Sequence, residues 1–396
     1  LNIKLAKRMS GLRASEVREI LKITERPEII SFAGGLPAPE LFPLEEIKRV
    51  SQLVLDEMGP KALQYSTTEG FPPLRQWVAE RMNRRYGLKL EQDNILITSG
   101  SQQVLDLSGK LFLDEGDVVL CENPTYLAAI TAFRAYGCEF REVETDDVGM
   151  IPEALEKALA ETGRAKLIYV IPDFQNPTGR TWSRERREAL AALAARFEVA
   201  IVEDNPYGEL RFEGEFLPAV MSFDQHEGVI YGGTFSKIFC PGYRVGWVAG
   251  EKELVRKFVM AKQGTDIQCN TKAQMELMRY LELYDIEAHI ERIRAVYRSR
   301  RDLALSVMAA EFPPSARFTR PEGGLFAWVE LPEGLNARDV LVKSLEKNVA
   351  FVPGGAFFPN GGHENTLRIN FSNMPEDRIV DGMKRLGAVL REMIGA

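Results

Sequence analysis

The sequence predicts an α/β fold, with a large domain built on a mostly parallel sheet flanked by helices and a small α+β domain. From about residue 94, short apolar runs alternate with segments of helical periodicity, which is the pattern of βαβ units. Residues 296–396 instead combine short strand-like runs with helical stretches. A chain of 396 residues is also too long for one ordinary hydrophobic core, which indicates two domains or one large domain with a lobe.

The elements of the large domain follow from these patterns in chain order. The first ~40 residues fit neither pattern and predict one short helix, then the turn-rich stretch SFAGGLPAPELFP. Strands are expected at NILIT, DVVLCE, KLIYVIP, VAIVED, VIYGGTF and VGWVAG. Helices are expected between the earlier strands, at Gln102–Leu113, Thr125–Tyr136 and Arg184–Phe197, and again as long helices from Glu251 to about Ala310.

The C-terminal part predicts a separate small domain. Strands are expected at LFAWVEL, AFVPG and TLRINF, and a final helix near Glu376–Ile394. We therefore divide the chain into an N-terminal segment (1–44) that packs with the small domain, a large domain (45–295) and a small domain (296–396). A cleft is expected between the two domains.

Composition excludes several classes of function. The formal net charge is −7 and the pI about 5.4, which argues against nucleic acid or an anionic membrane surface as partner. No apolar run approaches the ~20 residues of a membrane span. The four cysteines form no C-x-x-C pair and the three histidines are scattered, so we expect no metal site and a cytoplasmic location.

Candidate ligand-binding residues follow the predicted strands, because ligands of open α/β sheets bind beyond the carboxyl ends of the strands. After NILIT, Ser101 and Gln102 open a helix whose N–H groups can hold an anion, although an ordinary helix cap is the alternative. After DVVLCE, Tyr126 can stack on a flat ring or simply pack. After KLIYVIP, Asn176 lies in the turn NPTG.

The last two strand ends add charge. Asp204 ends VAIVED with Tyr207 close behind, and a carboxylate ending a buried strand requires a partner. The stretch YGGTFSKIFCPGYRVGW places Lys237 just after Thr234 and Ser236, with Arg244 seven residues later; an exposed loop lysine is the alternative. Together these groups suit a ligand with a phosphate, a planar ring bearing a basic nitrogen and a hydroxyl, and an aldehyde, which describes pyridoxal 5′-phosphate (PLP).

The motifs QNPTG, EDNPY and GTFSKIFCPGYRVG resemble the class I/II aminotransferases of PLP fold type I in kind, order and spacing. SFAGGLPAPELFP, LQYSTTEG, TSGSQQVLDL, VAFVPGGAFF and NTLRINFS are most similar to the 2-aminoadipate/kynurenine aminotransferase branch. The resemblance covers the chain from about Ala14 to its end. It implies a seven-stranded, mostly parallel sheet, PLP as cofactor, and a homodimer with shared active sites.

The resemblance also implies a role for each candidate residue. Lys237 would form the Schiff base with PLP and then move the substrate proton, while Asp204 would keep the ring nitrogen protonated. Asn176 and Tyr207 would bond the ring oxygen, and Tyr126 would stack on the ring. The phosphate would be held by Ser101, Gln102, Thr234, Ser236 and Arg244, and by Tyr65 from the partner subunit. The substrate would be bound by Arg368, Asn176, Gly35 and Arg18.

The two substrate-binding arginines each have an alternative. Alternation along TLRINF puts Thr366, Arg368 and Asn370 on one face, so Arg368 is either a solvent-facing arginine on an edge strand or, as we favour, the clamp for the α-carboxylate. Arg18 lies at the edge of an apolar helical stripe in ASEVREILK. It is either a surface salt-bridge residue or the binder of a side-chain carboxylate.

We therefore expect a PLP-dependent aminotransferase (EC 2.6.1) that moves the amino group of an L-amino acid to a 2-oxo acid such as 2-oxoglutarate by a ping-pong mechanism. The donor would be 2-aminoadipate, glutamate, or an aromatic or branched-chain amino acid. A PLP-dependent β-lyase or decarboxylase is the alternative on the same fold. A more remote alternative is the effector-sensing domain of a transcription regulator, which would need a basic helix-turn-helix domain ahead of this one.

Overall fold

A computed structural model describes residues 3–4, 6–11, 20 and 26–395. Among these residues, its main sheet has seven strands and confirms the predicted α/β class. In spatial order the strands are β2 (Ile95–Thr98), β10 (Gly246–Ala249), β9 (Val229–Thr234), β8 (Ala200–Asp204), β7 (Ala165–Val170), β3 (Val118–Glu122) and β4 (Glu139–Val143). Only β10 runs against its neighbours within this described sheet.

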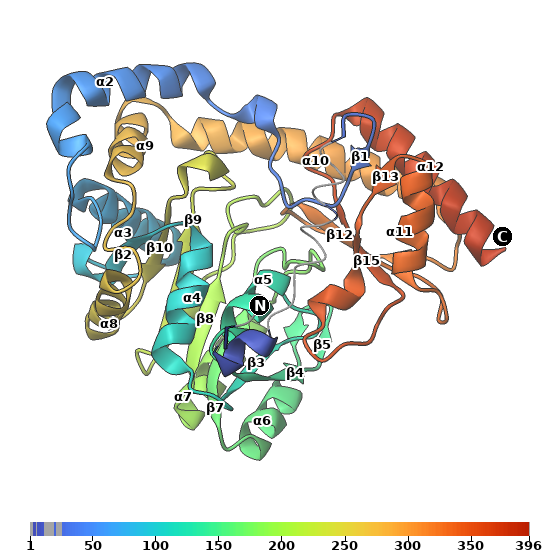
Figure 1. Ribbon diagram of the computed structural model, residues 1–396, viewed down its shortest axis with the longest axis horizontal. Helices are drawn as coiled ribbons and strands as arrows, with labels where there is room; N and C mark the ends of the chain where they lie inside the picture. The colour runs from blue at the N-terminus through green and yellow to red at the C-terminus, as the bar shows by residue number, and fades with distance from the viewer. Residues whose placement is uncertain (1–2, 5, 12–19, 21–25, 396) are drawn as a thin grey trace.

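Helices cover both faces of the main sheet (Figure 1). They are α3 (Pro72–Tyr86), α4 (Ser101–Phe112), α5 (Leu127–Arg134), α6 (Pro152–Glu161), α7 (Arg184–Phe197) and α8 (Lys252–Gln263). The central strands are consequently buried on both faces, as expected for a parallel sheet in an α/β protein. The short hairpin of β5 (Thr145–Asp146) and β6 (Gly149–Met150) lies beside this body.

Strand β4 is the one member of the main sheet that the apolar runs did not indicate. Its sequence EFREV alternates between exposed Glu139 and Arg141 and half-buried Phe140 and Glu142, and only its last residue, Val143, is buried. It is the edge strand next to β3, and one of its faces is exposed along most of its length. A run-based search finds strands that are buried on both faces, and an edge strand of this kind escapes it.

The C-terminal elements form a second layer at the other end of the molecule (Figure 1). Its antiparallel sheet has, in the described residues, the order β11 (Arg317–Phe318), β12 (Phe326–Glu330), β15 (Thr366–Asn370) and β14 (Val352–Pro353). Helices α11 (Ala337–Glu346) and α12 (Glu376–Ile394) pack here. The N-terminal stretch joins this part, because β1 (Ile30–Ser31) pairs in parallel with β13 (Val349–Ala350).

Long helices connect the two parts. Helix α2 (Leu44–Ala62) packs on α9 (Thr271–Leu283), and α10 (Ile286–Glu311) runs unbroken to the C-terminal layer, where it packs on α12. The division at residues 295 and 296 therefore falls inside a continuous helix and stays a prediction. Short 3₁₀ turns occupy Lys7–Gly11, Pro39–Leu41, Gln92–Asn94, Val220–Phe223, Pro241–Tyr243 and Gly354–Phe357.

Helix boundaries differ slightly from those expected. Helix α5 begins at Leu127 rather than Thr125, because Tyr126 has an extended backbone and precedes the first helical residue. The short helix predicted near the N-terminus, including Arg18, lies outside the described residues. Among the helices that the structure does describe, none is both long and apolar enough to cross a membrane.

Candidate functional site

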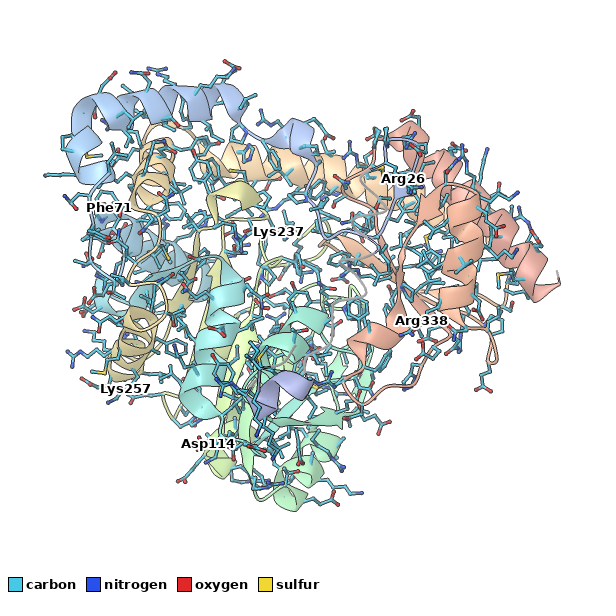
Figure 2. The ribbon with its side chains drawn as sticks, viewed as in Figure 1. Arg26, Phe71, Asp114, Lys237, Lys257 and Arg338 are labelled. Carbon is cyan, nitrogen blue, oxygen red and sulfur yellow. The ribbon has the colours of Figure 1, made fainter. Side chains whose placement is uncertain are left out.

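The predicted lysine is half-buried and follows strand β9 by three residues (Figure 2). Lys237 Nζ donates a hydrogen bond to the backbone oxygen of Gly35, at 2.8 Å. Gly35 comes from the N-terminal stretch that pairs with the C-terminal layer, so both ends of the chain and the main sheet meet at this amine. Burial and, to a smaller extent, the nearby charges of Arg368 and Arg244 together lower the pKa of Lys237 to about 8. A neutral amine, which is the nucleophilic form, is therefore accessible near neutral pH.

Asp204 ends strand β8 and is 2% exposed. Its Oδ2 accepts a hydrogen bond from the hydroxyl of Tyr169 on β7, at 2.8 Å. Its Oδ1 is buried and has no hydrogen-bond partner among the described residues. Burial raises the pKa of this carboxyl to about 7, and the bond from Tyr169 opposes the rise. A buried carboxylate with one unpaired oxygen can accept a hydrogen bond from an N–H group of a ligand.

Arg368 lies on β15 between β12 and β14, so the alternative of a solvent-facing residue on an edge strand is wrong. Its guanidinium donates to Asn176 Oδ1 and to the backbone oxygen of Ala33, both at 2.7 Å. Asn176 in turn donates to the Tyr207 hydroxyl at 3.4 Å. Burial lowers the pKa of Arg368 to about 10, so the group stays charged at neutral pH.

The apolar surroundings of Arg368 leave part of its guanidinium available. The group lies over the ring of Phe326, 4.2 Å from the ring centre, and over that of Phe357, at 5.1 Å. Its Nε is buried and lacks a hydrogen-bond partner among the residues that the structure describes. A buried cation with an unused donor is an anchor for an anionic group.

An anion cradle forms where helix α4 begins. Gly100 precedes the helix with a φ of +72°, and a Cβ there would lie 2.5 Å from Arg244 Nη2, so only glycine allows this approach. No side chain of the described residues caps this helix, so the N–H groups of Ser101 and Gln102 are available to an anion. Arg244 reaches the Ser236 hydroxyl at 3.5 Å, and that hydroxyl accepts from Thr234 at 2.9 Å.

Two of the remaining predicted residues differ in position. Tyr126 is half-buried just before the start of α5. Burial and the charge of Asp204 raise the pKa of its hydroxyl, and the charges of Arg368 and Arg244 oppose the rise. Tyr65 is 80% exposed, and its described contacts do not include the other site residues. One chain therefore gathers the predicted site except for Tyr65 and for Arg18, which lies outside the described residues.

The pattern of the family "aminotransferase class I and II" matches residues 32–386. The chain belongs to this family of aminotransferases. The aromatic-amino-acid aminotransferase 1 of Thermococcus litoralis is 45% identical over 386 residues, covering 96% of this chain and 93% of that protein. The 2-aminoadipate transaminase of Thermus thermophilus is also 45% identical over 386 residues, covering 97% and 95% of the two chains.

The fold of this aminotransferase is shared with solved relatives. A crystal structure of Pyrococcus horikoshii kynurenine aminotransferase, in complex with PMP, superposes with a TM-score of 0.94 at 43% identity. The match covers 99% of this chain and 98% of that one. The family, the enzyme class (EC 2.6.1) and PLP as cofactor, all predicted from the motifs, are confirmed.

The geometry of the aminotransferase site fits PLP. The free Oδ1 of Asp204 suits a protonated ring nitrogen, the cradle at Gly100 suits a phosphate, and the amine of Lys237 suits an aldehyde. Each of these observations concerns a different atom of the cofactor. The fold thus brings residues that are more than a hundred positions apart in the sequence to one ligand.

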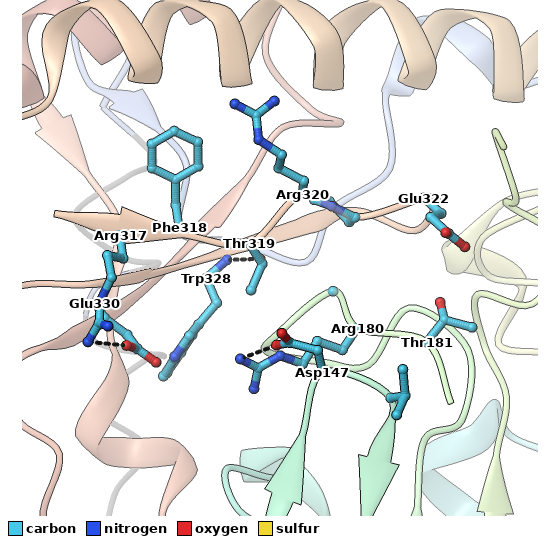
Figure 3. Close-up of a pocket in the computed structure, with 13 residues that line it drawn as sticks. Asp147, Arg180, Thr181, Arg317, Phe318, Thr319, Arg320, Glu322, Trp328 and Glu330 are labelled. Carbon is cyan, nitrogen blue, oxygen red and sulfur yellow. Dashed lines mark hydrogen bonds and ion pairs between the residues drawn. The ribbon is translucent and has the colours of Figure 1, made fainter. Parts of the chain in front are cut away.

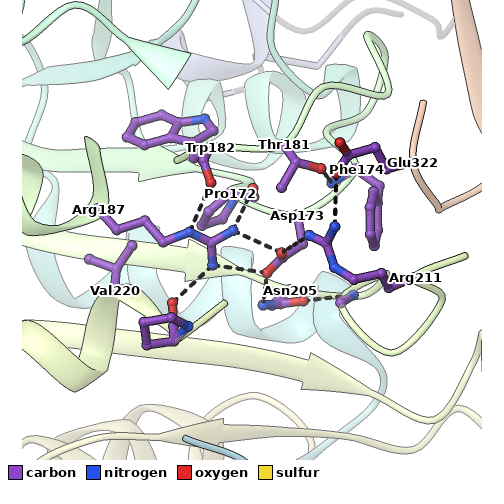
Figure 4. Close-up of polar contacts among 12 residues, drawn as sticks. Pro172, Asp173, Phe174, Thr181, Trp182, Arg187, Asn205, Arg211, Val220 and Glu322 are labelled. Atoms are coloured by element: carbon purple, nitrogen blue, oxygen red, sulfur yellow. Dashed lines mark hydrogen bonds and ion pairs between the residues drawn. The ribbon is translucent and has the colours of Figure 1, made fainter. Parts of the chain in front are cut away.

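A buried ion pair that the sequence patterns did not indicate supports this site (Figure 4). Arg187 of α7 binds Asp173 through two nitrogens, at 2.8 and 3.2 Å, and Asp173 also accepts from the Asn205 amide at 2.9 Å. Asp173 lies three residues before Asn176, and Asn205 directly follows Asp204. Asp173 therefore links the loop that carries Asn176 to the end of β8, and Arg187 holds it against α7. An arginine in register with Leu190, Ala191 and Ala194 on the buried face of α7 was the available signal.

A separate cavity of about 590 Å³ lies between the Gly179–Thr181 loop and the C-terminal sheet (Figure 3). Neither Lys237 nor Asp204 lines it. Two of its three arginines are paired, Arg180 with Asp147 at 2.9 Å and Arg317 with Glu330 at 3.5 Å. We assign no part of the candidate site to this cavity.

Proposed function

We propose that this aminotransferase takes the amino group of an L-α-amino acid and passes it to a 2-oxo acid such as 2-oxoglutarate. The observation that carries the proposal is the buried guanidinium of Arg368, which has an unused Nε and lies in the same site as Lys237. Both side chains bind the stretch Ala33–Gly35, which keeps them close together. A cation at that place binds the α-carboxylate and presents the substrate Cα to the lysine.

The chain's own residues would act as follows. PLP, when bound, supplies a ring that withdraws electrons from the substrate Cα. Lys237 Nζ would take up and carry the Cα proton, while Asp204 would hold a proton on the ring nitrogen. Asn176 and Tyr207 would bond the ring oxygen, and Tyr126 would stack on the ring. The phosphate would be held by Ser101, Gln102, Thr234, Ser236 and Arg244.

The amino donor is proposed to be an aromatic amino acid, kynurenine or 2-aminoadipate. These are the substrates in the names of the relatives above. Glutamate and branched-chain amino acids are further candidates. Arg18 is proposed to bind a distal carboxylate, which only a dicarboxylic donor carries. A donor panel with 2-oxoglutarate ranks these classes by kcat/KM. Measurable kcat/KM with acidic donors alone would favour Arg18 as a specificity residue. A kcat/KM for leucine and phenylalanine equal to that for the acidic donors would argue against this role.

The role of Arg368 is tested by a matched pair of donors, phenylalanine and phenethylamine, which differ only in the α-carboxylate. The parent enzyme should use the amino acid with a much higher kcat/KM than the amine. Arg368→Gln should lower kcat/KM for phenylalanine by roughly 10- to 100-fold, because a hydrogen bond to a charged group contributes roughly 1.5–3 kcal/mol. Its preference for phenylalanine over phenethylamine should shrink by the same factor. A variant that loses activity but keeps the parent's preference would contradict the assignment.

We further propose a cytoplasmic homodimer with shared active sites, and large and small domains that meet near residue 295. The support is Tyr65, which the family resemblance assigns to the phosphate but which is exposed and makes no described contact with the other site residues of its own chain. Tyr65 would complete the cradle at Arg244 of the partner subunit. The protein should then sediment as a dimer or a larger assembly.

Mixing two defective proteins tests whether Tyr65 acts across the interface. If it does, a hybrid of Lys237→Ala and Tyr65→Phe subunits contains one native site and one doubly altered site. The mixture should therefore recover the PLP affinity and turnover of native sites, which neither parent variant has. If Tyr65 acts within its own chain, no native site forms and mixing recovers nothing. An active monomer at working concentration would also overturn the proposal.

A further inference from the structure

Tyr169 contacts Asp204, the carboxylate that the proposed function pairs with the ring of the cofactor. It lies on β7, next to β8, and is 1% exposed. Its ring packs edge-on against Phe133 of α5, with the ring centres 5.7 Å apart. Its hydroxyl donates to Asp204 Oδ2 at 2.8 Å. The phenol is therefore fixed by packing at one end and by the carboxylate at the other.

The two oxygens of Asp204 are consequently not equivalent. Oδ2 is bonded to Tyr169, whereas Oδ1 is buried without a partner among the described residues. A hydrogen bond to one oxygen fixes the plane of the carboxylate and leaves the other oxygen for a second donor. A donated O–H also favours the ionised form of the acid that accepts it.

We propose that Tyr169 is a positioning residue that holds Asp204 in its charged form and in one orientation toward the ring nitrogen of the cofactor. The proposal rests on the proposed function, because it acts through the pairing of Asp204 with that nitrogen. Tyr169 itself touches neither the substrate nor the cofactor in this role. It determines whether a deeply buried carboxyl carries the charge that the chemistry requires.

The electrostatics of the site support this role. Burial raises the pKa of Asp204 to about 7, and the hydrogen bond from Tyr169 is the contact that lowers it. Burial and the neighbouring Asp204 carboxylate raise the pKa of Tyr169 well above its ordinary value, so the phenol keeps its proton and remains a donor. Burial raises the pKa of the Tyr126 and Tyr207 hydroxyls, and the charge of Asp204 raises it further, so both hydroxyls also keep their protons.

The sign of the pH effect follows from these shifts. Asp204 loses its charge as pH falls through its pKa. Removing the bond from Tyr169 raises that pKa further, so the carboxyl becomes neutral at a higher pH than in the parent. Any defect caused by losing Tyr169 should therefore be largest in mild acid and should fade as pH rises.

The test is Tyr169→Phe, which removes only the hydroxyl and keeps the ring against Phe133. Apoenzyme is titrated with PLP from pH 6 to 9, and kcat is measured over the same range. We expect PLP affinity and kcat to fall about tenfold at pH 6.5, the scale of one hydrogen bond to a charged group, and to approach the parent at pH 9. The acid limb of the kcat profile should move up by about one pH unit.

A matched control exists within the chain. Tyr136 donates to Asp106 Oδ1 at 2.9 Å, which is the same kind of bond away from the site. Tyr136→Phe should leave the PLP affinity and the pH profile unchanged. A Tyr169→Phe enzyme with the parent's pH profile, or with an equal loss at every pH and a lower melting temperature, would overturn the proposal.

A double variant separates this proposal from the proposed function. If Tyr169 acts through Asp204, adding Tyr169→Phe to Asp204→Asn should cause no further loss of PLP affinity or kcat. An additional tenfold loss in the double variant would mean that Tyr169 acts by another route, which contradicts the inference alone. If Asp204→Asn itself behaves like the parent, the assigned role of Asp204 fails.

Discussion

Replacing Lys237 with alanine is expected to abolish transamination and to leave the fold intact. The side chain is half-buried and its one described hydrogen bond goes to the backbone oxygen of Gly35, so its loss removes little packing. The reaction, however, loses both its nucleophile and its proton carrier. General acid–base help alone contributes 10²- to 10⁴-fold, so we expect kcat to fall by at least ~10⁴-fold.

Borohydride reduction gives a second measurement of the same assignment. In the parent it should fix the cofactor on the peptide that contains Lys237, whereas Lys237→Ala should bind PLP reversibly through the cradle at Arg244. PLP should also react with apoenzyme faster as pH rises through about 8, because the neutral amine forms above the pKa of Lys237. Lys252→Ala is the control, since Lys252 pairs with Glu91 on the surface. A fixed cofactor on any other lysine would refute the assignment.

The second large effect is expected from Asp204→Asn, which keeps the shape of the side chain and removes its charge. Without that charge the ring nitrogen loses the partner that keeps it protonated. The loss of such a charge-assisted contact in a buried site should lower kcat by at least ~10²-fold, with a smaller loss of PLP affinity. Both quantities are measured at a pH well above 7, where Asp204 of the parent is ionised.

The neighbouring carboxylate provides the control for this experiment. Glu203 is buried on the same strand, and it accepts hydrogen bonds from the backbone N–H groups of Val220 and Met221 rather than facing the site. Burial raises its pKa to about 7, like that of Asp204. Glu203→Gln should alter stability without altering kcat. An Asp204→Asn enzyme within a few-fold of the parent would mean that Asp204 only shapes its loop.

The fold class was accessible from the sequence because buried strands of a parallel sheet are continuous apolar runs. The runs at β3, β7, β8 and β9 are buried on both faces, and this burial gives them their composition. The edge strand β4 alternates instead and was missed. The antiparallel direction of β10 was also not readable, since strand direction depends on the connection and not on the residues of the strand.

The chemistry of the site was accessible for a related reason. Ligands of such sheets bind at the strand ends, so the polar residues that follow each run could be collected before their distances were known. Lys237, Asp204, Asn176 and Arg368 were found in this way or through family resemblance. The sequence thereby determined which functional groups the protein brings to its cofactor and substrate.

Only the tertiary structure decided how these groups act on one another. The bond from Tyr169 to Asp204, the pair of Arg187 and Asp173, and the burial of Arg368 all join residues from different elements. The sequence around a tyrosine or an arginine in an apolar segment is the same whether the side chain supports a catalytic carboxylate or only packs in the core. The difference lies in which side chains meet across the core, and in how far burial shifts their charges, and both are properties of the folded chain.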